Sequence, residues 1–85
     1  MSRYRVQYLQ QAADDLALVW HDAQDRGVVT RASYEAEQEL SSDPLRFAEH
    51  LSEGLYRLEV PPLRLYFTVR DEDHTIEVCN IKSAT

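Results

Sequence analysis

The 85-residue chain has room for one domain, residues 1–85, and its hydrophobic content of 44% predicts a folded core rather than a disordered segment. Nine basic against fifteen acidic residues give a net charge of −6, and Lys82 is the only lysine, so extended binding to nucleic acid is disfavoured. The lone Cys79 excludes an internal disulfide, and no stretch approaches the roughly 20 apolar residues that span a bilayer. We therefore expect a cytoplasmic protein that contacts no membrane.

The start of the chain is predicted to form a strand followed by a helix. Apolar and polar side chains alternate over residues 3–9, which is the pattern of a half-buried strand. Over residues 10–26 the apolar side chains recur at steps of three and four, which indicates an amphipathic helix. Gly27 is expected to end this helix. Trp20, which lies on the apolar stripe, is assigned to the core, with a contact to a partner chain as the alternative.

A thinner apolar stripe predicts a second helix over residues 30–40. Thr30 is a suitable N-cap residue, and the cluster Ser41-Ser42-Asp43-Pro44 stops the helix. Residues 45–53 have no clear period and are interpreted as a loop with room for one helical turn.

The last third of the chain is predicted to be a β-meander, with strands over residues 55–60, 63–70 and 75–81. A hairpin centred on the two prolines at 61 and 62 sorts the side chains into an apolar face and a polar face, which favours that register. The expected facing pairs are Val60/Leu63, Leu58/Leu65, Tyr56/Phe67, Val69/Ile76 and Phe67/Val78.

These elements predict an α+β fold with the order β-α-α-β-β-β. The two helices form a hairpin that packs on one face of an antiparallel four-stranded sheet, and the other face is open to water or to a partner. The open face is expected to hold Arg57, Glu59, Arg64, Tyr66, Thr68, Glu77 and Cys79.

The open face holds the main candidate chemistry. Arg57 and Arg64 come from adjacent strands with Tyr66 beside them, and two guanidinium groups with a phenol can hold a phosphate and stabilise developing charge. A purely structural role is the alternative, because Glu59 faces Arg64 and opposite charges across strands are ordinary in sheets. From the residues alone, the structural role is favoured over the phosphate-binding role.

Other polar groups suggest no catalytic or metal site. The spacing of His21, His50, His74 and Cys79 fits no metal site, so neither a metal nor a cofactor is expected. Asp14 and Asp15 are interpreted as favourable charges near a helix start rather than as a catalytic pair, because adjacent helical residues point about 100° apart.

The sequence resembles the RelE/ParE superfamily, often called plasmid stabilisation proteins. Residues 51–58 (LSEGLYRL) and 63–69 (LRLYFTV) resemble that family's Gly-x-Tyr-Arg-Ile strand and the Tyr/Leu-Arg-x-x-Tyr strand that follows it. The Asp43-Pro44 pair closes the second helix ahead of them. Asp14-Asp15-Leu16 with Trp20 resembles the family's helical opening, so the similarity spans nearly the whole chain.

The resemblance implies a toxin of a type II toxin–antitoxin system, neutralised by a cognate antitoxin. RelE-type members cut messenger RNA on the ribosome, and ParE-type members bind and inhibit DNA gyrase. For RelE-type cleavage the resemblance implies roles for Arg57, Arg64 and Tyr66, with Lys82 near the usual histidine position. In a related branch that uses a glutamate, Glu49 corresponds to the acid.

The sequence departs from the RelE pattern in two respects. Glu59 stands where a second basic residue is usual, and the terminal imidazole is absent. Because acid–base cleavage depends on such groups, we expect ribonuclease activity to be weak or absent. Inhibition of gyrase requires no catalytic set and is therefore favoured. A degenerate, non-toxic relative that acts as an interaction module is the remaining alternative.

Overall fold

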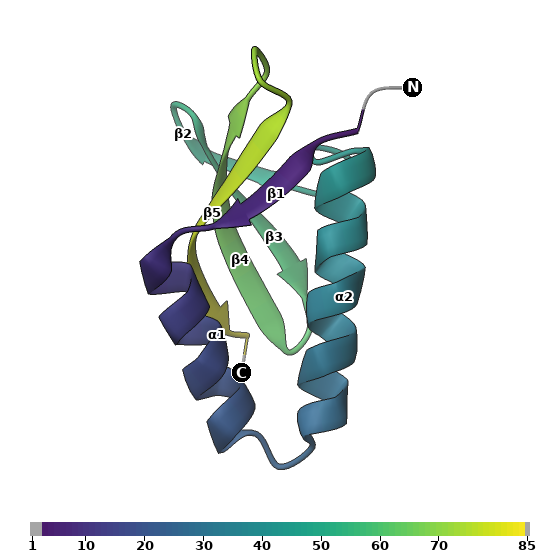
Figure 1. Ribbon diagram of the computed structural model, residues 1–85, viewed down its shortest axis with the longest axis vertical. Coiled ribbons are helices and arrows are strands. Elements are labelled where there is room, and N and C mark those ends of the chain that lie inside the picture. The colour runs from purple at the N-terminus through teal and green to yellow at the C-terminus, as the bar shows by residue number, and fades with distance from the viewer. Residues whose placement is uncertain (1–2, 85) are drawn as a thin grey trace.

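The structure, a computed structural model, describes residues 3–84. It is an α+β fold in which a helical hairpin packs against a sheet, as expected (Figure 1). In chain order the elements are β1 (Arg5–Tyr8), α1 (Gln10–Asp22), α2 (Arg26–Ser42), β2 (Glu49–Ser52), β3 (Leu55–Val60), β4 (Leu63–Arg70) and β5 (Thr75–Ser83).

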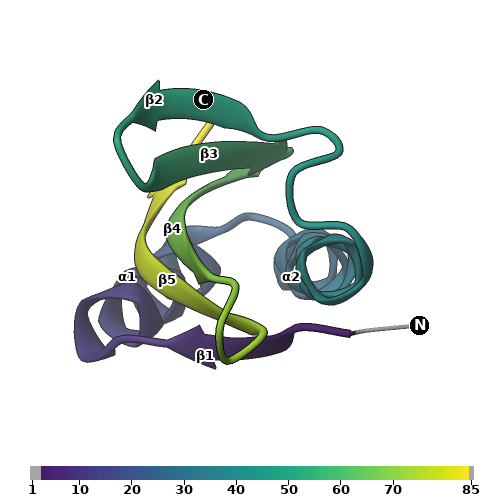
Figure 2. The same cartoon turned by 90° about the horizontal axis from the view of Figure 1, so that it is seen from above.

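The sheet has five strands in the order β1-β5-β4-β3-β2. It is mixed rather than fully antiparallel, because β1 pairs parallel to β5 while the other neighbours are antiparallel. The sheet curls strongly from β1 to β2, and α2 lies on its concave side (Figure 2). The expected antiparallel four-stranded sheet therefore has to be corrected in strand number and in the direction of β1.

The additional strand, β2, lies in the segment that the sequence predicted as a loop. All four of its residues are exposed, so it lacks the alternation of apolar and polar side chains that reveals a half-buried strand. A tight turn connects it to β3, with Gly54 at φ +77°, a backbone conformation that favours glycine.

All five predicted facing pairs of the β-meander are present. The ladder between β4 and β5 departs from the predicted register beyond Val78. A β-bulge places Asn80, rather than Cys79, opposite Tyr66. The bulge also brings Ile81 opposite a buried leucine of β4, so that β5 continues to Ser83.

The junction between the helices differs from the prediction. Gly27 does not end α1; it lies in the first turn of α2, and Thr30 lies one turn further along. The N-cap of α2 is Asp25, whose carboxylate accepts hydrogen bonds from the backbone N–H groups of Gly27 (3.0 Å) and Val28 (3.3 Å). A carboxylate at this position satisfies donors that the helix leaves without partners, which explains the earlier start.

Arg26 links the end of α1 to the start of α2. Its guanidinium donates hydrogen bonds to the backbone carbonyl oxygens of Trp20 (3.2 Å) and His21 (3.1 Å) and lies 4.7 Å from the centre of the Trp20 ring. Trp20 is 42% exposed, so its assignment to the core was wrong. The indole lies at the edge of the helical hairpin and is partly covered by Arg26.

The core lies between the helices and the inner face of the sheet. Its largest fully buried side chains are Phe67, Leu40, Leu63, Leu65, Ile76 and Val78. Ala12 is the fully buried residue of α1, while α2 contributes Val29, Ala32, Ala36 and Leu40. Within residues 3–84, no helix is both long and apolar enough to cross a membrane.

Candidate functional site

The face of the sheet away from the core brings together all five predicted site residues. In the first row across the strands, Glu49 of β2 faces Arg57 of β3, which faces Tyr66 of β4. In the second row Arg64 of β4 faces Lys82 of β5. Paired residues of neighbouring strands project from the same face of a sheet, so the five side chains form one surface, called here the basic face.

Arg57 occupies the centre of the first row. It forms an ion pair with Glu49, and its side chain is 30% exposed against 60% for the glutamate. Hydrogen bonding to Tyr66, and then to Glu49, raises the pKa of Arg57 above its ordinary value. The guanidinium is thus held between a carboxylate and a phenol.

Tyr66 lies between the two arginines of the basic face. Hydrogen bonding from Arg57 is the largest cause of a lowered pKa for the Tyr66 phenol, and Arg64 adds to this effect. The ammonium nitrogen of Lys82 lies 5.8 Å from the centre of the tyrosine ring. The two guanidinium groups therefore favour the ionised form of this hydroxyl, while Lys82 lies over the ring.

The second row contains one acidic neighbour. Arg64 donates a hydrogen bond from Nε to the carboxylate of Glu59 at 3.1 Å, and the two side chains are 32% and 46% exposed. The cross-strand pair expected from the sequence is therefore present. Its partial exposure leaves part of the guanidinium able to contact a ligand.

The surface as a whole is slightly basic in a strongly acidic protein. When the neighbouring Glu59 is counted with the basic face, three cationic side chains and two carboxylates leave one net positive charge there, whereas the whole chain carries −6. Chemically, the guanidinium groups can hold phosphate oxygens, and a phenol of lowered pKa ionises at a lower pH than an ordinary tyrosine, which makes its phenolate available as a general base.

Two residues near this surface could not be located from the sequence. Asn80 extends the first row beyond Tyr66 because the bulge shifts the register of β5. Asp15 reaches the same end of β5 from α1, where its carboxylate accepts a hydrogen bond from the backbone N–H of Ile81 at 3.0 Å. The sequence contains no signal for either contact, because both depend on the tertiary arrangement.

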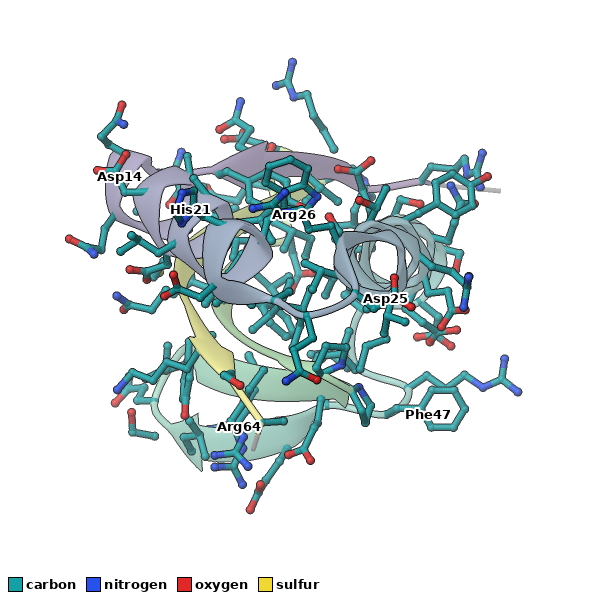
Figure 3. The ribbon with its side chains drawn as sticks, turned by 90° about the horizontal axis from the view of Figure 1, so that it is seen from below. Asp14, His21, Asp25, Arg26, Phe47 and Arg64 are labelled. Atoms are coloured by element: carbon teal, nitrogen blue, oxygen red, sulfur yellow. The ribbon has the colours of Figure 1, made fainter. Side chains whose placement is uncertain are left out.

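The histidines lie apart from the basic face. His50 pairs with Tyr56 on the opposite face, with ring centres 5.2 Å apart, and His74 lies 5.3 Å from the ring of Tyr4. His21 lies near the end of α1, well separated from Arg64 in Figure 3. Within residues 3–84, no group of three or more histidine, cysteine or acidic side chains could hold a metal ion.

A second feature of the surface is an apolar groove of about 550 Å³ between α1 and α2. Tyr8, Leu16, Trp20, Val29 and Glu37 are among the residues that line it. Burial, with a contribution from the nearby carboxylate of Glu37, raises the pKa of Tyr8 to about 12. The groove is thus apolar along most of its length and acidic near the tyrosine.

No protein-family model matches the chain, and no curated protein matches it in sequence. Solved structures do match it. The structure of the toxin–antitoxin complex RelBE2 from Mycobacterium tuberculosis contains a chain that aligns with a TM-score of 0.82 and 22% identity, over 100% of this chain and 97% of that one.

Two further solved structures agree with this match. A chain of the archaeal RelE–RelB complex from Pyrococcus horikoshii OT3 gives a TM-score of 0.70 at 19% identity, over 95% of this chain and 94% of that one. The isolated RelE toxin of Escherichia coli gives 0.69 at 16% identity, over 96% of this chain and 85% of that one. The chain therefore has the fold of the RelE toxins, which confirms the resemblance at the level of the fold.

Proposed function

We propose that this protein is the toxin of a type II toxin–antitoxin system and is neutralised by a cognate antitoxin. The observation that supports this most is the RelE-like fold over the whole chain, with a TM-score of 0.82 to a chain of a toxin–antitoxin complex. Because a fold can host several functions, the proposal also rests on the surfaces that this chain presents.

The groove between α1 and α2 is a suitable place for the antitoxin. An amphipathic helix can place apolar side chains along its apolar length. The acidic end of the groove, near Glu37, would suit a lysine or arginine of the partner. A partner bound there would also cover Trp20, which is 42% exposed in the free chain.

For the action of the toxin, inhibition of DNA gyrase by binding is the first proposal, because it needs no catalytic set. The second proposal, cleavage of ribosome-bound messenger RNA, is supported by the way Arg57, Tyr66, Arg64 and Lys82 meet on one surface. In that reaction the phenolate of Tyr66 would take the proton of the 2′-hydroxyl as its oxygen bonds to phosphorus, and the arginines would stabilise the charge on the phosphate. The bond from phosphorus to the 5′-oxygen would break, and that oxygen would leave with a proton taken from water.

Growth of bacteria under controlled expression tests the toxin proposal. Three proteins are compared: the natural sequence, Arg64→Ala and Arg70→Ala. Arg70 is a matched control, because it lies on the same strand but pairs with Asp73 and Glu77, outside the basic face. Each protein is checked for soluble accumulation before growth is compared.

The outcomes separate the proposals. Arrest by the natural sequence and by Arg70→Ala, but not by Arg64→Ala, supports an action through the basic face. Arrest by all three supports binding to a target such as gyrase, which a supercoiling assay then tests. Normal growth with all three proteins accumulated contradicts the toxin proposal and favours the non-toxic interaction module. Co-expression with the product of a neighbouring small reading frame should relieve any arrest.

A further inference from the structure

The outer edge of β5 changes partner along its length. β1 pairs with residues 75–78 of β5, and this pairing stops at Val78. The strand continues to Ser83, and α1 lies beside it there. At this point the carboxylate of Asp15 accepts the backbone N–H of Ile81 at 3.0 Å. Since Ile81 is 3% exposed, its amide is largely withheld from water, and the carboxylate provides the hydrogen bond that β1 no longer supplies.

The bulge lies between the end of the β1 pairing and this contact. It decides which residues of β5 project onto the basic face, because a slip of one residue reverses the face of every side chain that follows. With the bulge in place, Asn80 faces Tyr66 and Lys82 faces Arg64. Asp15 therefore contacts the first buried residue that follows the bulge.

Asp15 is itself held in position. Gln11, one turn earlier on α1, donates a hydrogen bond to its second carboxylate oxygen at 2.8 Å. Asn80 also forms a hydrogen bond with Asp15, and the charge of Lys82 attracts it. Its neighbour Asp14 is exposed and accepts a hydrogen bond from Gln10 at 2.9 Å, so the two adjacent carboxylates have different surroundings.

We infer that Asp15 is a positioning residue, which fixes the end of β5 so that Asn80 and Lys82 join the basic face. This inference rests on the proposed function in so far as the basic face binds phosphate groups. It replaces the expectation that Asp14 and Asp15 act together as charges near a helix start. Asp15 belongs to α1 and acts on the basic face through the backbone N–H of Ile81 and through its hydrogen bond with Asn80.

The first test follows the geometry by NMR in Asp15→Ala, Asp15→Asn and the matched control Asp14→Ala. In Asp15→Ala the exchange of the Ile81 amide should speed up about tenfold or more, because a hydrogen bond to a charged acceptor is lost. Proximity signals between the methylenes of Lys82 and the Tyr66 ring should disappear. Asp15→Asn keeps one acceptor oxygen and should retain part of both signals, and Asp14→Ala should leave both unchanged.

The second test measures binding of a short single-stranded RNA at a temperature where every variant is folded. Removing any carboxylate makes the protein less negative, so an effect of net charge alone would strengthen binding in both Asp15→Ala and Asp14→Ala. Positioning predicts the opposite for Asp15→Ala, a loss as large as that of Lys82→Ala. The double variant, which combines Asp15→Ala with Lys82→Ala, should bind RNA no more weakly than Lys82→Ala alone, because both changes remove the same contact of Lys82 with RNA.

Tighter binding by Asp15→Ala, or unchanged Ile81 exchange, would overturn the inference. Additive losses in the double variant would also contradict it, since they would show that Asp15 and Lys82 act separately. If the natural protein and Arg64→Ala bind RNA equally, the phosphate-binding role of the basic face fails. The exchange of Ile81 and the proximity of Lys82 to Tyr66 then still decide whether Asp15 positions the strand.

Discussion

At the bulge, three residues of β5 lie opposite two residues of β4, so we expect that one residue of β5 can be deleted without disrupting the fold. In the present chain Val78 points into the core, Asn80 faces Tyr66 and Ile81 points into the core again, so Cys79 is the extra residue of the bulge. Removing Cys79 makes the three remaining residues alternate inward, outward and inward. The same residues should then meet the same partners, with a regular ladder in place of the bulge.

A deletion on the partner strand should behave very differently. Without Thr68, the residues of β4 that precede the deletion and those that follow it cannot both keep their present inward and outward directions. Either Phe67, which is fully buried, leaves the core, or Arg70 enters it. Loss of a buried phenylalanine costs about 3–5 kcal/mol. A chain of this length has a total stability of about 4–13 kcal/mol. Deletion of Cys79 removes one half-buried side chain, which is worth about 1 kcal/mol.

Urea unfolding followed by circular dichroism measures both deletions against the natural sequence. Deletion of Cys79 should lower the free energy of unfolding by no more than about 1.5 kcal/mol, with an unchanged slope against denaturant. Deletion of Thr68 should leave little or no folded protein. If the Cys79 deletion is as damaging as the Thr68 deletion, the bulge is required for the fold and the reasoning about face alternation is wrong.

Three further substitutions follow from single contacts. Arg26→Met should lower the free energy of unfolding by about 1–2 kcal/mol and change the fluorescence of Trp20, because two hydrogen bonds and a cation–π contact are lost. Alkaline spectroscopic titration should find one phenol with a pKa of about 12, and Tyr8→Phe should remove it. Because the folded pKa of Tyr8 lies above the unfolded value of about 10, its contribution to stability is complete below pH 10 and is lost as the pH rises toward 12. Arg57→Met should raise the pKa of the Tyr66 phenol toward its ordinary value, and an unchanged pKa in the same titration would contradict the proposed hydrogen bond.

The β-meander could be predicted because several local signals agreed. The two prolines fixed the centre of the hairpin between β3 and β4, and one register then placed most of the large apolar side chains of these strands on one face. The predicted pairs Leu58/Leu65 and Phe67/Val78 both lie in the core. Where the period, the turn chemistry and the burial all agree, the sequence determines the pairing.

The elements that were missed carry conflicting or weak local signals. Asp25 and Gly27 are two residues apart, and each is a recognised signal at a helix end, one for a start and the other for a stop. The capping hydrogen bonds of Asp25 decided the outcome. β2 has no buried residue, so its pairing with β3 is the main feature that marks it as a strand.

The candidate site was predictable only in part, for a related reason. Arg57, Arg64 and Tyr66 follow from the alternation of β3 and β4, which is a local property. Glu49 and Lys82 came from the resemblance, and their places beside Arg57 and Arg64 depend on β2 and on the bulge. Neither of these features leaves a periodic signal in the sequence, so no inspection of the residues alone could have positioned them.

From the net negative charge of the chain and the few cations of the basic face, we predict how the affinity for RNA depends on salt concentration. A protein that binds RNA through few phosphates releases few counterions. A plot of the logarithm of the binding constant against the logarithm of the salt concentration then has a slope of about −0.7 for each phosphate contact with a single strand. With three cations on the basic face, the slope should be about −2. The acidic groups elsewhere repel RNA, and salt screens that repulsion over distances longer than about 10 Å, which makes the slope shallower still.

The slope is measured by RNA binding over a range of salt concentrations, with Arg64→Ala as the comparison. Loss of one phosphate contact should make the slope less steep by about 0.7 and weaken binding at every concentration. A slope steeper than about −4 would require more cationic contacts than the basic face provides, and it would place the RNA elsewhere. The measurement therefore distinguishes a local phosphate site from extended binding, which is the distinction that net charge alone cannot make.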